Sequence, residues 1–289
     1  MKIKILIPVY NDFQSVSKLI NDINSVISNL NEEFSIIIVN DGSTEKTEID
    51  ISNFDKINSI KVINIKHNKG HARCIATGLR YIYENEEFDY VIPMDGDGED
   101  RSEEIKNFVE NINFSPDKAI VGERVKRTEK LIFKICYKIH KALTYLSTGQ
   151  SIKFGNYTCL PKSTVEKMIN EKATWSSFSG ALQKVEKDKV EVPSERGVRY
   201  FGPSKMSFLN LIKHSLSIIS VFKFNVLIRS VLFLVVYLFL ISESISNITL
   251  IPFYLVILLN ILTFYFSNRE SIEGLNDSLD NIITVDQIN

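Results

Sequence analysis

The stretch Phe88-Asp89-Tyr90-Val91-Ile92-Pro93-Met94-Asp95-Gly96-Asp97-Gly98-Glu99-Asp100 joins an apolar run to alternating carboxylates and glycines. The apolar run predicts a buried strand, and Ser102-Glu103-Glu104-Ile105 predicts a helix start. Since residues two apart on an extended backbone point the same way, Asp95, Asp97 and Glu99 are expected to converge. Crowded carboxylates favour a cation among them, and without Cys or His nearby that cation is Mg²⁺ or Mn²⁺ rather than zinc. The alternative is an acidic turn that caps the following helix.

Apolar strands and amphipathic helices alternate over the first 120 residues of the chain. Strands are expected at residues 2–9, 34–39, 60–65, 88–94 and 119–121, and helices at 12–30 and 70–83. This alternation predicts an α/β fold with a mostly parallel sheet and helices on both faces. Ligands bind beyond the carboxyl ends of such strands. Asp12, Asp41 and Asp95 each follow a strand, so we expect them to line one rim.

Charge and cysteine content exclude several classes of protein. The 289 residues carry a formal net charge of −1, which gives no indication of nucleic-acid binding. The 3 cysteines have no paired spacing, so ordinary buried thiols are expected rather than disulfides or a zinc site. No signal peptide is expected at the N-terminus, because its apolar run is short and has no small-residue cleavage site.

Two apolar segments near the C-terminus, residues 226–242 and 248–266, approach the length that crosses a bilayer. The short segment between them has no Lys or Arg, whereas basic residues flank the pair, so the positive-inside rule predicts a two-span membrane hairpin with both ends cytoplasmic. The alternative is a buried hairpin in a soluble core. The expected domains are 1–204 (the α/β domain), 205–224 (an interfacial amphipathic helix), 225–268 (the hairpin) and 269–289 (a polar, mobile cytoplasmic tail). The basic amphipathic segment 126–147 lies on a membrane surface or packs on the sheet edge.

Three rim motifs together resemble those of the family 2 glycosyltransferases, which have the GT-A fold. They are Pro8-Val9-Tyr10-Asn11-Asp12, Val39-Asn40-Asp41-Gly42-Ser43-Thr44 and Asp95-Gly96-Asp97, and Asn68-Lys69-Gly70 with Gly78 resembles the family's helix start. The resemblance covers roughly residues 3–205. It implies that Asp41 binds the nucleobase and that Pro8, Tyr10 and Asp12 line the nucleoside pocket. Asp95 would lie near ribose and metal, and Asp97 with Glu99 would hold Mg²⁺ or Mn²⁺. The alternative for Asp41 is a turn residue.

Residues 94–104 resemble the metal-motif run of the polyprenyl-phosphate sugar synthases, which include dolichyl-phosphate mannose synthase and the bacterial undecaprenyl-phosphate glucosyltransferases. Gly98, Glu99 and Arg101-Ser102 depart from that run, and Glu99 adds a charge to the metal shell. Two basic stretches also resemble these enzymes: Gly122-Glu123-Arg124…Arg127 and Arg199-Tyr200-Phe201-Gly202-Pro203-Ser204-Lys205. They imply an acceptor phosphate held by Arg124, Arg127, Arg199 and Lys205. The alternative for each is a solvated surface charge or a lipid-headgroup contact.

Weaker expectations concern three further places at the rim. Gly155-Asn156-Tyr157 is expected on the acceptor side by resemblance. His71 and Arg73 could reach the diphosphate, although a structural role is favoured, and Trp175 is expected to pack rather than to bind sugar.

The resulting hypothesis is a membrane-bound inverting glycosyltransferase. It would move a hexose from a UDP- or GDP-hexose donor to polyprenyl phosphate at the cytoplasmic face, with Asp95, Asp97, Arg124 and Arg199 as its catalytic residues. A lipid phosphate is already an anionic nucleophile, so no general base is needed. One alternative is the same fold with a hydroxyl acceptor, which would need a carboxylate or His base. Another is a catalytically silent nucleotide-binding membrane protein. Sugar, nucleotide, metal preference and oligomeric state stay open, and a homo-oligomer is compatible with the sequence.

Overall fold

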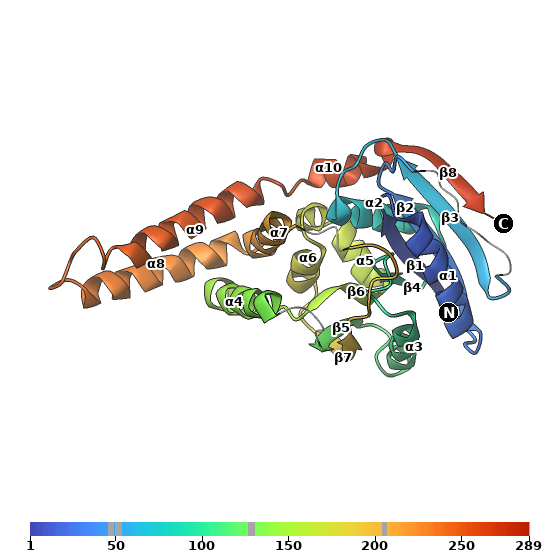
Figure 1. Ribbon diagram of the computed structural model, residues 1–289, viewed down its shortest axis with the longest axis horizontal. Helices are drawn as coiled ribbons and strands as arrows, with labels where there is room; N and C mark the ends of the chain where they lie inside the picture. Colours follow the sequence, from blue (N-terminus) through green and yellow to red (C-terminus); the bar gives the residue numbers. More distant parts are fainter. Residues whose placement is uncertain (46–48, 50–53, 127–130, 204–206, 289) are drawn as a thin grey trace. The chain divides into compact units, whose positions relative to one another are not determined.

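The computed structural model describes residues 1–45, 49, 54–126, 131–203 and 207–288. It divides into two compact units, which we describe separately. The sheet unit comprises Met1–Thr128, Lys153–Lys205 and Ser271–Asn289, and the helical unit comprises Glu129–Ile152 and Met206–Glu270. The chain therefore leaves the sheet unit twice, at residues 129–152 and 206–270, and returns to it each time (Figure 1). The expected single boundary between an α/β domain and a membrane hairpin is not observed.

The described residues of the sheet unit contain one eight-stranded sheet with the order β7-β5-β6-β4-β1-β2-β3-β8. The strands are β1 (Lys2–Val9), β2 (Glu33–Asn40), β3 (Ile57–Ile65), β4 (Tyr90–Pro93), β5 (Ala119–Lys126), β6 (Phe154–Pro161), β7 (Lys189–Glu195) and β8 (Ile282–Ile288). Neighbouring strands among β4, β1, β2 and β3 are parallel, as are β5 and β7. β6 runs antiparallel to β4 and β5, and β8 runs antiparallel to β3. The predicted α/β fold with a mostly parallel sheet is confirmed.

Helices cover both faces of the sheet because its central strands are apolar on both sides. The helices of this unit are α1 (Phe13–Ile27), α2 (His71–Asn85), α3 (Ile105–Phe114), α5 (Lys162–Ile169), α6 (Phe178–Val185) and α10 (Ile272–Asn276). Ile3, Ile5 and Ile7 of β1 share one buried cluster with α1 and α3. The opposite face of β1 carries Leu6, against which Gly78 of α2 packs.

Gly78 lets α2 approach the sheet, and a side chain there is expected to destabilise the protein. A Cβ on Gly78 would overlap Leu6 Cδ1 and lie 3.0 Å from Val39 Cγ2. Gly78→Val should therefore lower the free energy of unfolding by about 1–3 kcal/mol, as overpacking does. The measurement is the thermal midpoint of the purified protein, with Asn85→Ala at the exposed end of α2 as the control. An unchanged midpoint for Gly78→Val would contradict the close approach.

Most of the segment predicted as a mobile polar tail, residues 269–289, is folded: residues 271–288 belong to the sheet unit, so the prediction of mobility is wrong there. It forms α10, a short 3₁₀ helix (Asp277–Asn281) and β8, which pairs with β3 from Ile60 to Ile65. Leu275 is fully buried against Trp175 and Ala76, which confirms that Trp175 packs in the interior. The sequence concealed this strand because β8 is an edge strand whose side chains are mostly exposed. Its backbone pairing, rather than apolar alternation, attaches it to the sheet.

The helical unit consists, in its described part, of α4 (Leu131–Thr148), α7 (Phe208–Ser220), α8 (Lys223–Leu240) and α9 (Ile251–Ser267). α8 and α9 run side by side (Figure 1) and are joined by a hydrogen bond of 2.8 Å from Asn260 Nδ2 to Ser230 Oγ. Asn225 and Arg229 of α8 donate to main-chain carbonyls at the C-terminal end of α4. These helices match the predicted segments 126–147, 205–224, 226–242 and 248–266 to within a few residues.

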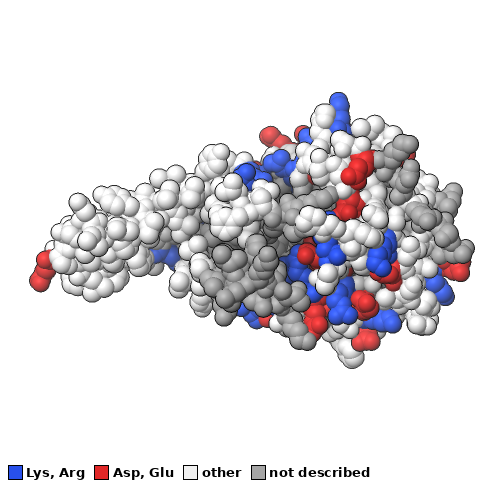
Figure 2. Space-filling view, viewed as in Figure 1, with Lys and Arg blue, Asp and Glu red and all other residues white. Residues whose placement is uncertain are grey.

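The surface of α8 and α9 is apolar over most of its area. Large apolar side chains that are more than half exposed on these helices include Leu232, Val235, Phe239, Leu255, Ile261 and Tyr265. Figure 2 shows almost no charged side chains on this hairpin. By length and composition α8 can cross a membrane. By the same measures α9 is a second candidate span when it is taken together with residues 272–281.

Candidate functional site

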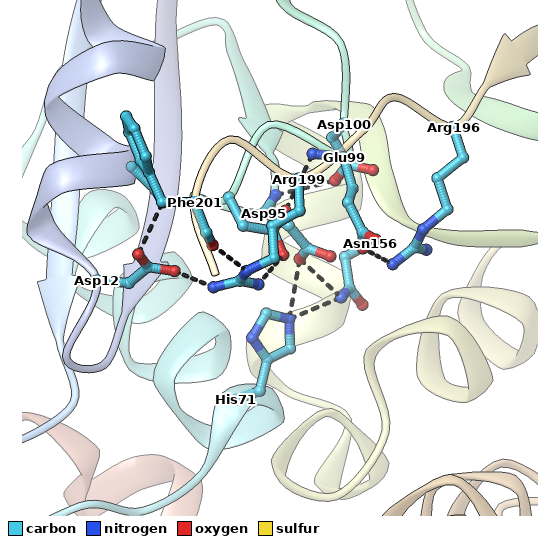
Figure 3. Close-up of polar contacts among 11 residues, drawn as sticks. Asp12, His71, Asp95, Glu99, Asp100, Asn156, Arg196, Arg199 and Phe201 are labelled. Atoms are coloured by element: carbon cyan, nitrogen blue, oxygen red, sulfur yellow. Dashed lines mark hydrogen bonds and ion pairs between the residues drawn. The ribbon is translucent and has the colours of Figure 1, made fainter. Parts of the chain in front are cut away.

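The carboxyl ends of β1, β2 and β4 bring Asp12, Asp41 and Asp95 to one rim of the sheet, as the strand order requires. Asp12 precedes α1, Asp41 follows β2, and Asp95 lies two residues beyond β4. Figure 3 shows Asp12 and Asp95 on opposite sides of the Arg199 guanidinium, with His71 below them. The rim is thus an acidic arc with basic side chains placed among its carboxylates.

The acidic turn, residues 95–100, does not place its three carboxylates on one point, and the prediction that they converge is wrong. Gly98 has a φ of +86°, so the backbone turns here instead of extending, and the two-residue alternation is lost. Asp95 faces His71, Asp97 faces Arg199 and Glu99 faces Arg196. Among the described residues, no three His, Cys, Asp or Glu side chains are grouped to hold one metal ion.

Residues 196–201, which follow β7 and which we call the arginine segment, lie across the acidic turn. Gly197 N donates to Glu99 O at 2.8 Å, and Tyr200 N donates to Asp97 O at 2.9 Å. The Tyr200 ring occupies the place of a Cβ on Gly98, which explains why glycine is required there. Tyr200 also donates its hydroxyl to Asp22 of α1 at 2.6 Å. The arginine segment is therefore fixed at both the turn and the neighbouring helix.

Arg199 bridges two of the predicted site carboxylates. Its guanidinium donates to Asp97 Oδ2 at 2.6 Å and to Asp12 Oδ2, and its Nε donates to Phe201 O at 2.9 Å (Figure 3). Its side chain is only 13% exposed. Arg196 binds Glu99 in the same way and was missed by the sequence analysis. The available signal was its place just ahead of the basic stretch, three residues before Arg199.

His71, the first residue of α2, connects the acidic turn to β6. Its Nε2 lies 3.2 Å from Asp95 Oδ1 and 2.8 Å from Asn156 Nδ2. Burial opposes ionisation of Asp95, but His71, with Arg196 and Arg124, holds the pKa of that carboxyl below its usual range. His71 thus contacts the site instead of having only the structural role favoured from sequence. Asn156 is on the expected strand beside it.

Asp100 is a further acidic group of the turn, and the sequence analysis did not assign it to the site. It is buried, and its Oδ2 accepts a hydrogen bond of 2.9 Å from Asp95 N. Burial and the nearby Asp95 charge raise the pKa of Asp100 to about 7. Burial and Asp95 also raise the pKa of Asp97. The acidic turn is therefore crowded with negative charge, which additional positive charge would stabilise.

Asp41 is anchored by the backbone at the start of α2. Its two oxygens accept from Lys69 N at 2.7 Å and Gly70 N at 2.9 Å, and burial raises its pKa despite these bonds. The turn role considered for Asp41 is thus present, and each oxygen keeps a second lone pair for a ligand. Of the other residues expected to line the nucleoside pocket, Tyr10 is 43% exposed at the rim, whereas Pro8 is buried within β1.

Arg124 of β5 lies beside Gly155 of β6. A Cβ on Gly155 would lie 2.6 Å from Arg124 Nη2. The arginine charge contributes to the lowered pKa of Asp95 and opposes the rise in the pKa of Asp100. Arg124 and Arg199 are therefore both close to the acidic turn. Arg127 and Lys205, the other two cations expected at the acceptor, lie outside the described residues.

Comparisons with known proteins identify the family and the fold. Residues 4–171 match the family model for glycosyl transferase family 2. A curated relative is the undecaprenyl-phosphate 4-deoxy-4-formamido-L-arabinose transferase of Photorhabdus laumondii. It is 29% identical over 220 residues, which cover 73% of this chain and 65% of the relative. The chain thus spans slightly less than two thirds of that relative's length.

Two solved structures share the fold. One is Staphylococcus aureus TarS 1–349 in complex with UDP-GlcNAc, with a TM-score of 0.54 and 14% identity, covering 97% of this chain and 91% of that one. The other is Mycobacterium tuberculosis glucosyl-3-phosphoglycerate synthase in complex with Mn²⁺, UDP and glucosyl-3-phosphoglycerate. Its TM-score is 0.53 at 13% identity, covering 78% of this chain and 79% of that one. The sheet is that of a GT-A glycosyltransferase, and because the family model matches more than half of the chain, the protein belongs to glycosyl transferase family 2.

Proposed function

We propose that the protein transfers a hexose from a nucleoside-diphosphate sugar to polyprenyl phosphate at the cytoplasmic face of a membrane. The observation that carries this proposal is the placement of Arg199 and Arg124 beside the acidic turn. A phosphate acceptor needs cations to hold it, whereas a hydroxyl acceptor needs a base. The named activity of the Photorhabdus relative, a transferase for undecaprenyl phosphate, supports the same acceptor class.

The acidic turn fits a divalent cation shared with the donor diphosphate. Mg²⁺ is commonly held by one or two carboxylates together with substrate phosphates, and Asp95 and Asp97 supply that donor set. The raised pKa of Asp97 reflects crowding of negative charge, which a cation relieves. Glu99 is the third carboxylate of the predicted set, and like Asp95 and Asp97 it has a basic partner in the structure. When bound, the ion would neutralise charge that develops on the leaving diphosphate.

The chain's own residues would then act on the two phosphate groups separately. Arg124 and Arg199 would orient the lipid phosphate, one of whose oxygens attacks the anomeric carbon of the donor. The glycosidic bond to the nucleoside diphosphate breaks as the new bond forms on the opposite face, so the configuration inverts. Asp41 and Tyr10 would hold the nucleoside. Four of the described rim carboxylates contact basic side chains, which makes these four poorly suited to act as a base for a hydroxyl acceptor; they are Asp12, Asp95, Asp97 and Glu99.

The return of the chain to the sheet unit supports an even number of membrane crossings. β7 precedes and β8 follows the intervening segment, and both belong to the same sheet, which supports both ends of that segment lying on one side of a bilayer. The apolar helices α8 and α9 provide two candidate spans. This connectivity supports the two-span hairpin independently of the distribution of basic residues.

Reconstitution tests the proposed function directly. The full-length protein in detergent is given undecaprenyl phosphate, a panel of UDP- and GDP-hexoses, and Mg²⁺ or Mn²⁺, and lipid-linked sugar is measured by mass spectrometry. We expect a lipid-linked product with at least one donor and none in the presence of excess EDTA. If no donor gives a lipid product but a soluble glycan is labelled, the acceptor assignment is wrong.

Gly155→Ala tests the role of Arg124 without changing the number of charges. The new methyl group would force the Arg124 guanidinium away, and that flexible side chain can move at little cost in stability. Because a charge-assisted hydrogen bond contributes about 1.5–3 kcal/mol, we expect the KM for polyprenyl phosphate to rise roughly 10-fold or more, with donor KM unchanged. Ser163→Ala, at the exposed start of α5, is the matched control. Equal acceptor KM in Gly155→Ala and wild type would count against Arg124.

A further inference from the structure

A chain of hydrogen bonds runs from the C-terminal strand β8 to the two loops that we assign to the nucleoside. Asn64 Nδ2 on β3 donates to Asp286 Oδ2 at 2.7 Å and to Thr284 Oγ1 at 2.9 Å, both on β8. Asn40 Nδ2 on β2 donates to Asn64 Oδ1 at 2.8 Å. The strand registers explain this arrangement, because Asn64 is paired with Asn40 on one side and with Thr284 on the other.

The chain continues from Asn40 into the loops themselves. Asn40 Oδ1 accepts from Ser43 N at 3.0 Å, and Ser43 Oγ accepts from Asn11 N at 2.9 Å. Asn11 Oδ1 in turn accepts from Thr44 N at 2.8 Å. Asn11 has a φ of +50°, a left-handed conformation that such local bonds stabilise. Loops 8–12 and 39–44 are thereby fixed to each other and to β8.

The direction of each amide along this chain depends on the one before it. An asparagine amide has a donor side and an acceptor side. Asp286 and Thr284 accept from Asn64 Nδ2, which leaves Asn64 Oδ1 to face Asn40. Asn40 must then present Nδ2 to Asn64 and Oδ1 to Ser43 N. Ser43 N at one end and the acceptors on β8 at the other impose the same direction on both amides, so loss of the β8 acceptors leaves the Asn64 amide held from one side only.

We infer that β8 is a positioning element of the donor pocket, with Thr284 and Asp286 setting the orientation of Asn64 and Asn40 and hence the shape of loops 8–12 and 39–44. This inference rests on the proposed function, in which these loops bind the nucleoside. Thr284 and Asp286 touch no substrate and act only through Asn64. The last strand of the chain thus contributes to donor affinity, although it follows the membrane segment in the sequence.

The test compares nucleotide binding by full-length variants in detergent. UDP and GDP, each with Mg²⁺, are titrated calorimetrically into wild type, Asp286→Ala, Asp286→Asn and the control Ile283→Ala, whose side chain is 63% exposed on the same strand. We expect Asp286→Ala to weaken binding of the preferred nucleotide about 3- to 10-fold, as the loss of one hydrogen bond does. Asp286→Asn, which keeps an acceptor oxygen, and Ile283→Ala should bind as wild type does.

A second readout separates positioning from a purely structural role. Donor KM should rise in Asp286→Ala in parallel with the binding constant, while acceptor KM, kcat at saturating donor and the thermal midpoint stay unchanged. Two results would overturn this inference and leave the proposed function standing. One is wild-type nucleotide affinity in Asp286→Ala. The other is a loss of affinity that accompanies a lower thermal midpoint and is not restored in Asp286→Asn. If wild type binds neither UDP nor GDP, the proposed function fails first and this inference fails with it.

Discussion

Replacing Asp97 with Asn is expected to lower kcat for sugar transfer by about 100- to 1000-fold, the range found when one electrostatic group of an active site is removed. Burial and the neighbouring Asp95 charge raise the pKa of Asp97, so its anionic form is destabilised where no cation is bound. A divalent cation with the donor diphosphate would relieve that crowding. An amide at this position removes the charge that attracts the cation, and it also removes the ionic partner of Arg199.

The fold should tolerate this change, which makes the result interpretable. The amide oxygen introduced by Asp97→Asn can keep the hydrogen bond that Asp97 Oδ1 accepts from Glu99 N at 3.0 Å. Circular dichroism and the thermal midpoint are expected to be close to those of wild type. Initial rates are measured over a range of Mg²⁺ and Mn²⁺ concentrations, with Asp117→Asn, an exposed turn carboxylate, as the control. Near-normal turnover in Asp97→Asn would refute the metal assignment.

Arg199→Ala is expected to reduce kcat/KM for polyprenyl phosphate about 100-fold, as removal of one electrostatic group of an active site does, and to affect the acceptor more than the donor. The guanidinium is held between Asp12 and Asp97, so it is already oriented at the rim before any acceptor arrives. Arg199→Lys should have an intermediate effect. An ammonium is a point charge and cannot reproduce the planar fork that contacts two carboxylates at once.

The same variants separate an acceptor role from a structural one. Arg101→Ala provides a matched arginine control, because within the described part of the chain the ion pairs of Arg101 are longer, 3.5 and 3.6 Å, and involve exposed carboxylates. Acceptor kinetics are measured at saturating donor and compared with nucleotide affinity from calorimetry. An Arg199→Ala protein with unchanged acceptor KM and kcat would remove Arg199 from the acceptor site and leave it as a link between α1 and the acidic turn.

The sequence predicted the central sheet and its rim because the information there is local. Each of β1 and β2 is one apolar run followed by its polar loop, and parallel pairing then places Asp12 and Asp41 at one edge. The acidic turn was misread for a local reason as well. Alternation at Asp95, Asp97 and Glu99 indicates a shared direction only on an extended backbone, and Gly98 adopts a left-handed φ. The glycines that flank Asp97 indicate that a turn, rather than an extended strand, could form here.

Contacts between residues that are distant in the sequence could not be predicted from local sequence patterns. Arg196 meets Glu99 only because the arginine segment crosses the acidic turn, and nothing in the spacing of the two residues announces this contact. β8 shows the same limit. Its polar, exposed side chains look like a tail, and only the free edge of β3, more than 200 residues earlier, gives it a place in the sheet.

That distance has a consequence for how the enzyme is made. β3 ends at residue 65 and β8 begins at residue 282, so at about 5–20 residues per second a ribosome needs roughly 10–40 s to synthesise the strand that covers the β3 edge. During that time the nascent chain carries an open strand edge, which invites pairing with other chains. The apolar hairpin emerges before β8 does. Completion of the sheet therefore follows synthesis of the proposed anchor, and a chain interrupted before residue 282 would be both incomplete at its donor loops and prone to aggregate.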